Sequence, residues 1–221
     1  MKSLKECLSG ALVLSLALSV MFVMAEPTLG LAIEDQFTVN QTVTSEISFA
    51  TNAADVTMTP SLGGITGGTS NGTTTVIVKT NDSSGYTMTI KASTSPAMQG
   101  NTQGSSIADY TPASASIPDF TYSVPSGQEF GYTVSASTTA DLAQKFLDNG
   151  TTCNTGSADT GTSASCWYNL STVATSTILR TTATPASGST SSIAFKLTIN
   201  SGGFVVEDTY TATATLTAVT N

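Results

Sequence analysis

The chain has 221 residues, a formal net charge of −8 at pH 7, only 10% charged residues and no histidine. An acidic chain lacks the electrostatic footprint of a protein that binds nucleic acid or anionic lipid. The missing histidine excludes Ser-His-Asp and Cys-His catalysis, histidine-ligated metals and the usual general base at neutral pH. We therefore expect no enzyme, no cofactor and no nucleic-acid partner.

Residues 1–32 have the layout of a secretory signal, which we expect to be helical. Two lysines precede an uncharged apolar run from Leu8 to Ala25. Small residues allow cleavage after Ala25 or after Ala32, and we favour Ala32 because a strand-like pattern begins just beyond it. An uncleaved membrane anchor is the alternative, since the run is about as long as the shortest spanning helices. The segment predicts a secreted, extracellular or cell-surface protein that meets the membrane only before cleavage.

Residues 33–221 are long enough to form a single domain with a sizeable core. The chain contains 41 Thr and 30 Ser, and the β-branched Thr suits solvent-facing positions of a pleated sheet. Period-two alternation recurs along the chain between clusters of Gly, Pro, Asn or Ser. We predict an all-β fold, an antiparallel β-sandwich of the immunoglobulin-like or jelly-roll-like type.

The first alternating run, FTVNQTVTSEISF at 37–49, would span over ~40 Å if straight, which is longer than a typical strand. Two interpretations stay open. The run bends and serves two sheets of its own domain, which we favour, or it is freed by signal cleavage and completes the sheet of a neighbouring copy. The apolar residues on one side of the run are Phe37, Val39, Val43, Ile47 and Phe49, with Gln41 and Ser45 as the only polar residues on that side.

The stretch VIVKTNDSSGYTMTIKAS at 76–93 contains two alternating runs joined by residues 81–85. The pattern predicts a hairpin whose alternate side chains face a core. Oxygen atoms at Asn81, Asp82 and Ser83, or at Glu207 and Asp208, could bind calcium. Because no EF-hand spacing is present and Asp-Ser-Ser-Gly is ordinary turn chemistry, we favour a simple turn.

Residues 137–166 are predicted to be an insertion that covers one end of the sandwich. STTADLAQKFLDNG offers N-cap residues at its start and Gly150 at its end, so it predicts one short helix. Of the three cysteines, Cys7 lies in the predicted signal, so cleavage leaves Cys153 and Cys166. An even cysteine count in a secreted chain predicts a disulfide, worth about 3 kcal/mol by loop closure. The alternatives are two free thiols or a pair of metal ligands. After cleavage the chain has no histidine or further cysteine to complete a four-ligand zinc site. The apolar stripe of the helix would be Leu142, Ala143, Phe146 and Leu147.

Asp159-Thr160-Gly161 is the tripeptide of aspartic proteases. In those enzymes it directly follows a buried apolar strand, and two copies must meet. Here its neighbours are small polar residues between the two cysteines. A polar turn is the better interpretation, and we predict no catalytic and no metal-binding residue.

The clearest alternation is in the last strand, residues 209–218. Every second residue from Thr209 to Thr217 is threonine, and the opposite face, from Tyr210 to Ala218, must be the buried one. A Thr-x-Thr ice-binding face would need several such strands stacked flat, and only one is visible.

Two segments of the chain resemble a known family. Gly85-Tyr86-Thr87-Met88-Thr89 stands where bacterial cell-surface proteins of the WxL type carry Gly-Trp-x-Leu-Thr. The final strand, Tyr210 to Ala218, is similar to the closing Tyr-x-Ala-x-Leu-x-Trp-x-Leu strand of these domains. Both tryptophans are replaced, by Tyr86 and Leu216, and the single Trp167 adjoins the cysteines instead.

The resemblance implies a secreted β-sandwich held non-covalently at the cell wall, with Tyr86, Met88, Tyr210 and Leu216 as core residues of the motif. Together with the sequence, it favours a bacterial cell-surface structural or adhesive protein without catalytic activity. The alternative is a pilin-like filament subunit that assembles by N-terminal strand donation. The expected partners are cell-wall or surface polymers, or other copies of the chain.

Overall fold

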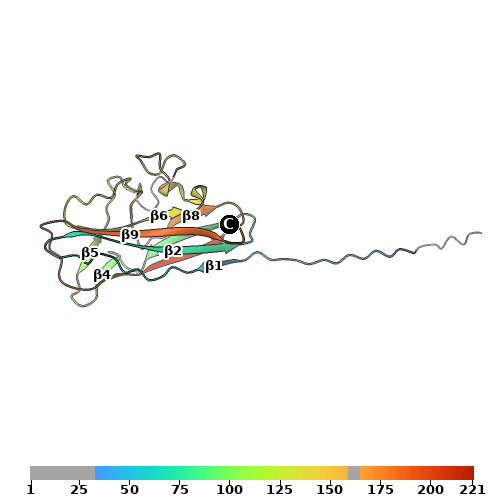
Figure 1. Ribbon diagram of the computed structural model, residues 1–221, viewed down its shortest axis with the longest axis horizontal. Coiled ribbons are helices and arrows are strands. Elements are labelled where there is room, and N and C mark those ends of the chain that lie inside the picture. Colours follow the sequence, from blue (N-terminus) through green and yellow to red (C-terminus); the bar gives the residue numbers. More distant parts are fainter. Residues whose placement is uncertain (1–32, 159–164) are drawn as a thin grey trace, which may run out of the picture. The chain divides into compact units, whose positions relative to one another are not determined.

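The computed structural model describes residues 33–158 and 165–221 (Figure 1). The predicted signal segment, with its candidate cleavage sites at Ala25 and Ala32, lies outside the described residues. So does the Asp159-Thr160-Gly161 tripeptide. The chain divides into two units, residues 1–43 and residues 44–221.

The described part of the first unit, residues 33–43, contains neither helix nor strand. Its apolar side chains are exposed, with exposed fractions of 95% at Ile33, 84% at Phe37, 82% at Val39 and 80% at Val43. Of the predicted run from 37 to 49, only residues 47–49 lie in a strand, and residues 37–46 belong to none.

The second unit contains all the regular elements of the described residues. The strands are β1 (Ile47–Thr51), β2 (Gly68–Thr80), β3 (Tyr86–Ala92), β4 (Met98–Gly100), β5 (Ser106–Asp109), β6 (Gln128–Ala136), β7 (Tyr168–Asn169), β8 (Thr175–Arg180), β9 (Ser189–Ile199), β10 (Tyr210–Ala212) and β11 (Ala214–Thr220). The helices are two short 3-10 turns, η1 (Thr139–Asp141) and η2 (Gln144–Phe146).

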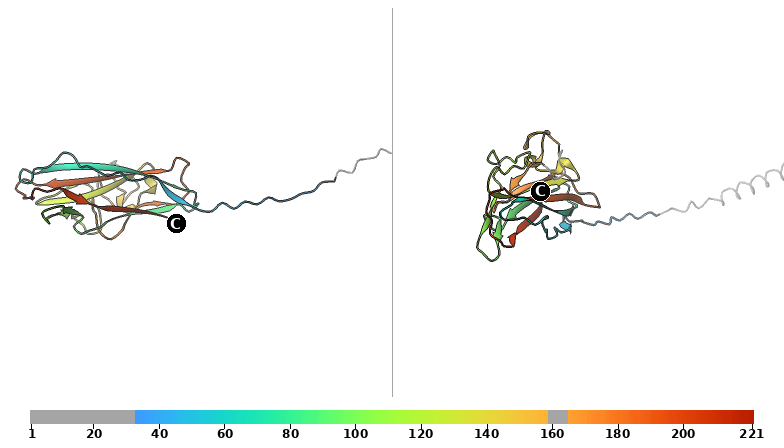
Figure 2. Two further views of the ribbon diagram at one scale, coloured as in Figure 1. Left: turned by 90° about the horizontal axis from the view of Figure 1, so that it is seen from below. Right: turned by 60° about the vertical axis from the view of Figure 1, so that its left-hand side comes forward.

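The strands form a curled sheet and a second sheet, so the fold is mostly β, as predicted (Figures 1 and 2). The curled sheet has the order β1-β2-β9-β6-β5-β4-β10, with β7 also paired to β6, and the second sheet has the order β11-β3-β8. One pair departs from the predicted antiparallel arrangement, because β5 and β6 run parallel. The long connection over 110–127 allows this, since parallel neighbours need a crossover rather than a tight turn.

Alternate side chains from both sheets fill the main core. Every second residue of β3 is buried, and the same periodicity holds along most of β2. A smaller cluster lies on the opposite face of the curled sheet, because Ala194 of β9 belongs to it while its neighbour Ile193 belongs to the main core. The largest fully buried residues of the main core include Tyr86, Met88, Ile90, Tyr132, Phe146 and Ile178.

The connection at 81–85 is a corner between the two sheets and not the predicted hairpin. β2 pairs with β1 and β9, whereas β3 pairs with β11 and β8. Gly85 has a φ of +81°, and a Cβ there would lie 2.2 Å from the carbonyl oxygen of Arg180, so the corner requires glycine. The faces were predicted correctly, since Tyr86 and Met88 are buried, but the partner strands were not.

The predicted helix after Ser137 is also absent, and only η1 and η2 occur there. Leu142 is extended and forms a β-bridge with Ile178, and the N–H of Ala143 donates to the carbonyl of Thr177. The segment thus satisfies its backbone against β8 instead of within a helix. All four apolar residues of the expected stripe are buried nonetheless.

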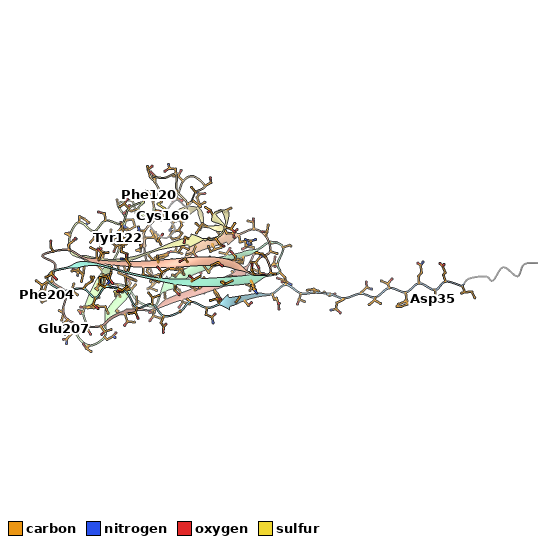
Figure 3. The ribbon with its side chains drawn as sticks, viewed as in Figure 1. Asp35, Phe120, Tyr122, Cys166, Phe204 and Glu207 are labelled. Atoms are coloured by element: carbon orange, nitrogen blue, oxygen red, sulfur yellow. A yellow bond between two sulfur atoms is a disulfide. The ribbon has the colours of Figure 1, made fainter. Side chains whose placement is uncertain are left out.

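The predicted disulfide between Cys153 and Cys166 is present, with Cα atoms 5.6 Å apart and both cysteines buried. The adjacent Trp167 packs edge-on against Tyr122, with ring centroids 5.2 Å apart. Tyr122 and Cys166 are labelled in Figure 3. Among the described residues, no helix is long and apolar enough to cross a membrane.

Candidate functional site: an apolar groove beside an unpaired strand edge

The strands β10 and β11 follow one another and leave one edge of each sheet unpaired. β10 pairs with β4 at the end of the curled sheet, and β11 pairs with β3 at the end of the second sheet. No strand of the described residues pairs with the other side of either element. We call this continuous free side, residues 210–218, the open edge.

The backbone of the open edge is available for pairing at every second residue. The carbonyls of Thr209 and Thr213 accept hydrogen bonds from Asn101 and Ser93, on the side of β4 and β3. Because backbone groups in an antiparallel pair alternate in direction, the N–H and C=O groups of Ala212, Ala214 and Leu216 are directed away from those partners. An extended segment laid along the open edge would find donors and acceptors there.

Beside the open edge lies a groove with a volume of about 1100 Å³. One wall is the open edge with the loop before it, and the other wall is the segment 53–65 between β1 and β2. The floor consists of residues from both sheets and of Leu170, which follows β7. The sheet residues are Ile90, Met98, Ile107, Phe130, Ile193, Phe195, Leu197 and Ile199. The groove is therefore an apolar trough that opens into the core.

The wall formed by residues 53–65 is held against β2 in an irregular conformation. Thr59 exchanges two backbone hydrogen bonds with Asn71, and the hydroxyl of Thr74 bonds to both the N–H and the carbonyl of Ala54. Gly72 makes room between these points, because a Cβ there would lie 2.3 Å from a methyl carbon of Val56. Part of the backbone of this wall is therefore hydrogen-bonded to β2, and the wall has no regular strand edge with which another strand could pair.

One end of the groove carries exposed apolar side chains. Ile65 is 71% exposed and Phe204 is 73% exposed, on two loops joined by a hydrogen bond from the N–H of Val205 to the carbonyl of Gly64. Phe204 and Glu207 mark the second loop in Figure 3. We call this end the apolar lip. Away from the lip, β1 lies close to β11. The start of β1 and the end of β11 both lie next to the corner at 81–85, because Ile47 pairs with Thr80 and Thr220 pairs with Tyr86.

The carboxylate of Asp208 fixes the start of the open edge. It accepts hydrogen bonds from the N–H groups of Gln103 and Thr102, from the hydroxyl of Thr102 and from the N–H of Thr209. These donors, first the N–H of Gln103 and then that of Thr102, lower the pKa of Asp208 to about 2. The acid suggested as a calcium ligand is thus engaged in holding a turn.

Asn81 and Asp82, two of the other calcium candidates, are engaged as well. The side chain of Asn81 accepts from the N–H of Glu46 and donates to the carbonyl of Thr44, and Asp82 accepts from the hydroxyl of Ser45. This hydroxyl, followed by the N–H of Ser84, lowers the pKa of Asp82. In the described part of the chain, no three His, Cys, Asp or Glu residues gather as a metal site. We call the Asn81 and Asp82 contacts the clamp on residues 44–46.

The four residues of the predicted motif occupy two environments. Tyr86 and Met88 lie fully buried in β3, whereas Tyr210 and Leu216 are half-buried on the wall of the groove. Their two segments do meet, because β3 and β11 are paired, with Ile90 opposite Leu216. The groove itself was missed from the sequence. In the sequence, the groove is indicated only by two small residues, Ala212 and Ala214, on the face of the last strand that was predicted to be buried.

Comparisons with protein-family models, with curated proteins and with solved structures find no match to this chain.

Proposed function

We propose that the protein is an exported structural subunit of the cell surface, which joins copies of itself by donating its N-terminal segment as a β-strand. The observation that carries this proposal is the exposure of residues 33–43. They keep the alternation of a strand, yet they belong to no strand, and Ile33, Phe37, Val39 and Val43 are at least 80% exposed. A soluble segment with this pattern needs a partner surface.

Binding to such a partner would be stabilised by burial of the apolar side chains of residues 33–43. Each large apolar side chain that leaves water contributes about 1.5–3 kcal/mol, before the cost of ordering the segment. The second face of residues 33–43 is entirely polar, with Glu34, Gln36, Thr38, Asn40 and Thr42. The first face is apolar apart from Asp35 and Gln41. This face suits an apolar trough over Phe37, Val39 and Val43, and the other face suits water, as in a strand at the surface of a sheet.

The groove of the folded unit has the matching features. It combines an apolar floor with an open edge whose backbone groups lack strand partners. Addition of a strand to such an edge gives affinity through main-chain hydrogen bonds and specificity through alternate side chains. It would also cover the exposed apolar lip.

A second copy is the better donor than the same chain. The clamp holds residues 44–46 beside the corner at 81–82, and from there β1 runs along β2 toward the wall of the groove. For residues 33–43 to enter the groove of their own unit, the chain would have to reverse just before residue 44. Residues 33–46 contain neither Gly nor Pro, the residues that most favour tight turns.

The proposal also includes a sandwich-type arrangement of the two sheets, export through the N-terminal segment and a place at the cell surface. The hydroxyl-rich exterior, the disulfide and the resemblance to WxL-type domains support these parts. It assigns the protein no catalytic role, and its partners are other copies of itself, with surface polymers as a further class.

The test uses the full mature chain, residues 33–221, and a variant with Phe37→Thr, Val39→Thr and Val43→Thr. These changes keep β propensity and remove the apolar stripe. We expect the unmodified chain to form linear assemblies in electron micrographs and in sedimentation velocity, and the variant to sediment as a monomer. The matched control changes the polar face, with Thr38→Ser, Asn40→Ser and Thr42→Ser, and should still assemble.

Circular dichroism and thermal unfolding should show that all three proteins share one fold. A mature chain that stays monomeric at every concentration would refute the proposal. So would a triple threonine variant that assembles as well as the unmodified chain.

A further inference from the structure

Building on the proposed assembly, we infer that the acceptor is the open edge of β10 and β11, and that the donated segment of a second copy lies antiparallel to it. Its odd-numbered residues face the groove. These are the apolar Phe37, Val39 and Val43 with Gln41 between them, and Asp35 lies toward the N-terminal end. Its even-numbered residues lie on the outer face beside Thr211, Thr213 and Thr215. The proposed function needs only that copies exchange strands, whereas this inference states where, in which direction and with which face.

The choice of edge follows from the two walls of the groove. The wall at 53–65 is irregular, and Ala54 and Thr59 already bond to β2. The open edge is regular, and its backbone groups at Ala212, Ala214 and Leu216 are directed away from β4 and β3. Only the open edge can therefore extend a sheet by a whole strand.

The side chains of the open edge leave space for a donor. Ala214 lines the groove and is nevertheless exposed, and Ala212 beside it is only half-buried. Two small residues in alternate positions create a shallow stretch between the larger Tyr210 and Leu216. Large side chains on the neighbouring strand, such as Phe37 and Val39, would fill it, because directly opposite residues lie close on one face of a sheet.

The direction follows from the two ends of the groove. The end beyond Leu216 lies beside β1, since β1 is close to β11 and both lie next to the corner at 81–85, whereas the apolar lip marks the end near Tyr210. The C-terminal end of the donated segment continues into the folded unit of its own chain. This end must therefore leave the groove at the apolar lip. Residue 43 then lies toward Tyr210 and residue 33 toward Leu216. Since β10 and β11 run from Tyr210 to Thr220, this arrangement is antiparallel, the slightly more stable pairing.

Disulfide trapping between two full mature chains tests the inference. The acceptor chain carries Thr213→Cys, and the donor chain carries Thr38→Cys, Asn40→Cys or Thr42→Cys, all on the outer face. The matched controls are donors with Val39→Cys or Gln41→Cys, which face the groove. In the mature chain both native cysteines are paired, so the engineered thiols report alone. We expect the best outer-face donor to give at least about tenfold more cross-linked heterodimer than either control, because cross-linked Cβ atoms must share a face.

Moving the acceptor cysteine tests the direction. When it moves from Thr211 to Thr215, antiparallel pairing predicts that the best donor position moves by the same number of residues toward the N-terminus. A shift toward the C-terminus would overturn the antiparallel arrangement. As an independent measure, Ala214→Asp, at an exposed position, should weaken assembly at least about tenfold while thermal unfolding of the unit stays nearly unchanged.

The outcomes separate this inference from the proposed function. If the unmodified chain assembles but the groove-facing donors cross-link as well as the outer-face donors, or Ala214→Asp has no effect, the inference is wrong and strand donation elsewhere remains. If the unmodified chain does not assemble, both are wrong.

Discussion

Residues 33–43 and residues 47–51 have the same alternating pattern but differ in burial and in strand pairing. Ile47 and Phe49 lie in β1, pair with β2 and pack against the core. Phe37 and Val39, on the same side of the pattern, are exposed and unpaired. The boundary between them coincides with the clamp, where Asn81 and Asp82 bond to residues 44–46.

Alternation therefore specifies which face of a strand is buried, and it does not specify the partner strand. β2 offers its edge to β1 over residues 77–80, and the pairing begins at Ile47. An amphipathic strand without an edge to join is satisfied by an edge on another molecule. On this account the two segments are equivalent strands in two different sheets.

The largest expected effect is on folding. Ile47→Ala with Phe49→Ala should lower the free energy of unfolding by about 2–4 kcal/mol, because large-to-small changes at packed positions lose burial and leave space behind. Phe37→Ala with Val39→Ala should change it by less than about 0.5 kcal/mol, since exposed side chains are lost without cost. Urea unfolding of dilute, monomeric protein measures both. Similar losses in the two variants would show that residues 33–43 fold with their own unit.

A smaller effect is expected at the clamp. Asn81→Ala removes two hydrogen bonds to the backbone of residues 44 and 46 and should cost about 1–2 kcal/mol. Hydrogen exchange at Glu46 and Ser48 should speed up, while exchange in β9 stays slow. If exchange at these amides is unchanged, the clamp does not set the boundary.

The smallest effect concerns pH. The hydroxyl of Ser45 and then the N–H of Ser84 lower the pKa of Asp82 in the folded chain. A lowered folded pKa contributes stability that is present above the ordinary value of about 4 and is lost as the pH falls through the lowered value. The clamp should therefore loosen only below about pH 4. Asp82→Asn should flatten this acid dependence, measured as thermal unfolding between pH 2 and pH 5 (about the range of carboxyl titration), and an unchanged profile would contradict the assignment.

Much of the fold could be predicted from local patterns. The buried faces of β2 and β3 and the disulfide follow from period two and cysteine count. The last strand was predicted only in part, because its expected buried face is half-buried and Ala214 is exposed. The expected helix failed because Leu142, Ala143, Phe146 and Leu147 suit either a helical stripe or a buried extended segment, and pairing with Thr177 and Ile178 decided between them. Local spacing does not contain that choice.

The candidate site could not be predicted for a related reason. The groove depends on which strand edges remain unpaired once β11 pairs with β3 and β10 pairs with β4. This is a property of the topology. The sequence did identify the segment that we propose as the donor, because its alternation is local. The proposed acceptor groove is lined by residues 53–65 and residues 204–216, two segments that are far apart along the chain.

Hydrogen exchange of the backbone amides of residues 34–43, measured on the mature chain at rising protein concentration, tests most directly whether this segment becomes a strand in another copy. We expect fast exchange in dilute solution and at least about tenfold slower exchange once assemblies form, with the amides of Ala212, Ala214 and Leu216 slowing together with them. Fast exchange of residues 34–43 at every concentration, or slow exchange that does not depend on concentration, would contradict the proposed strand donation.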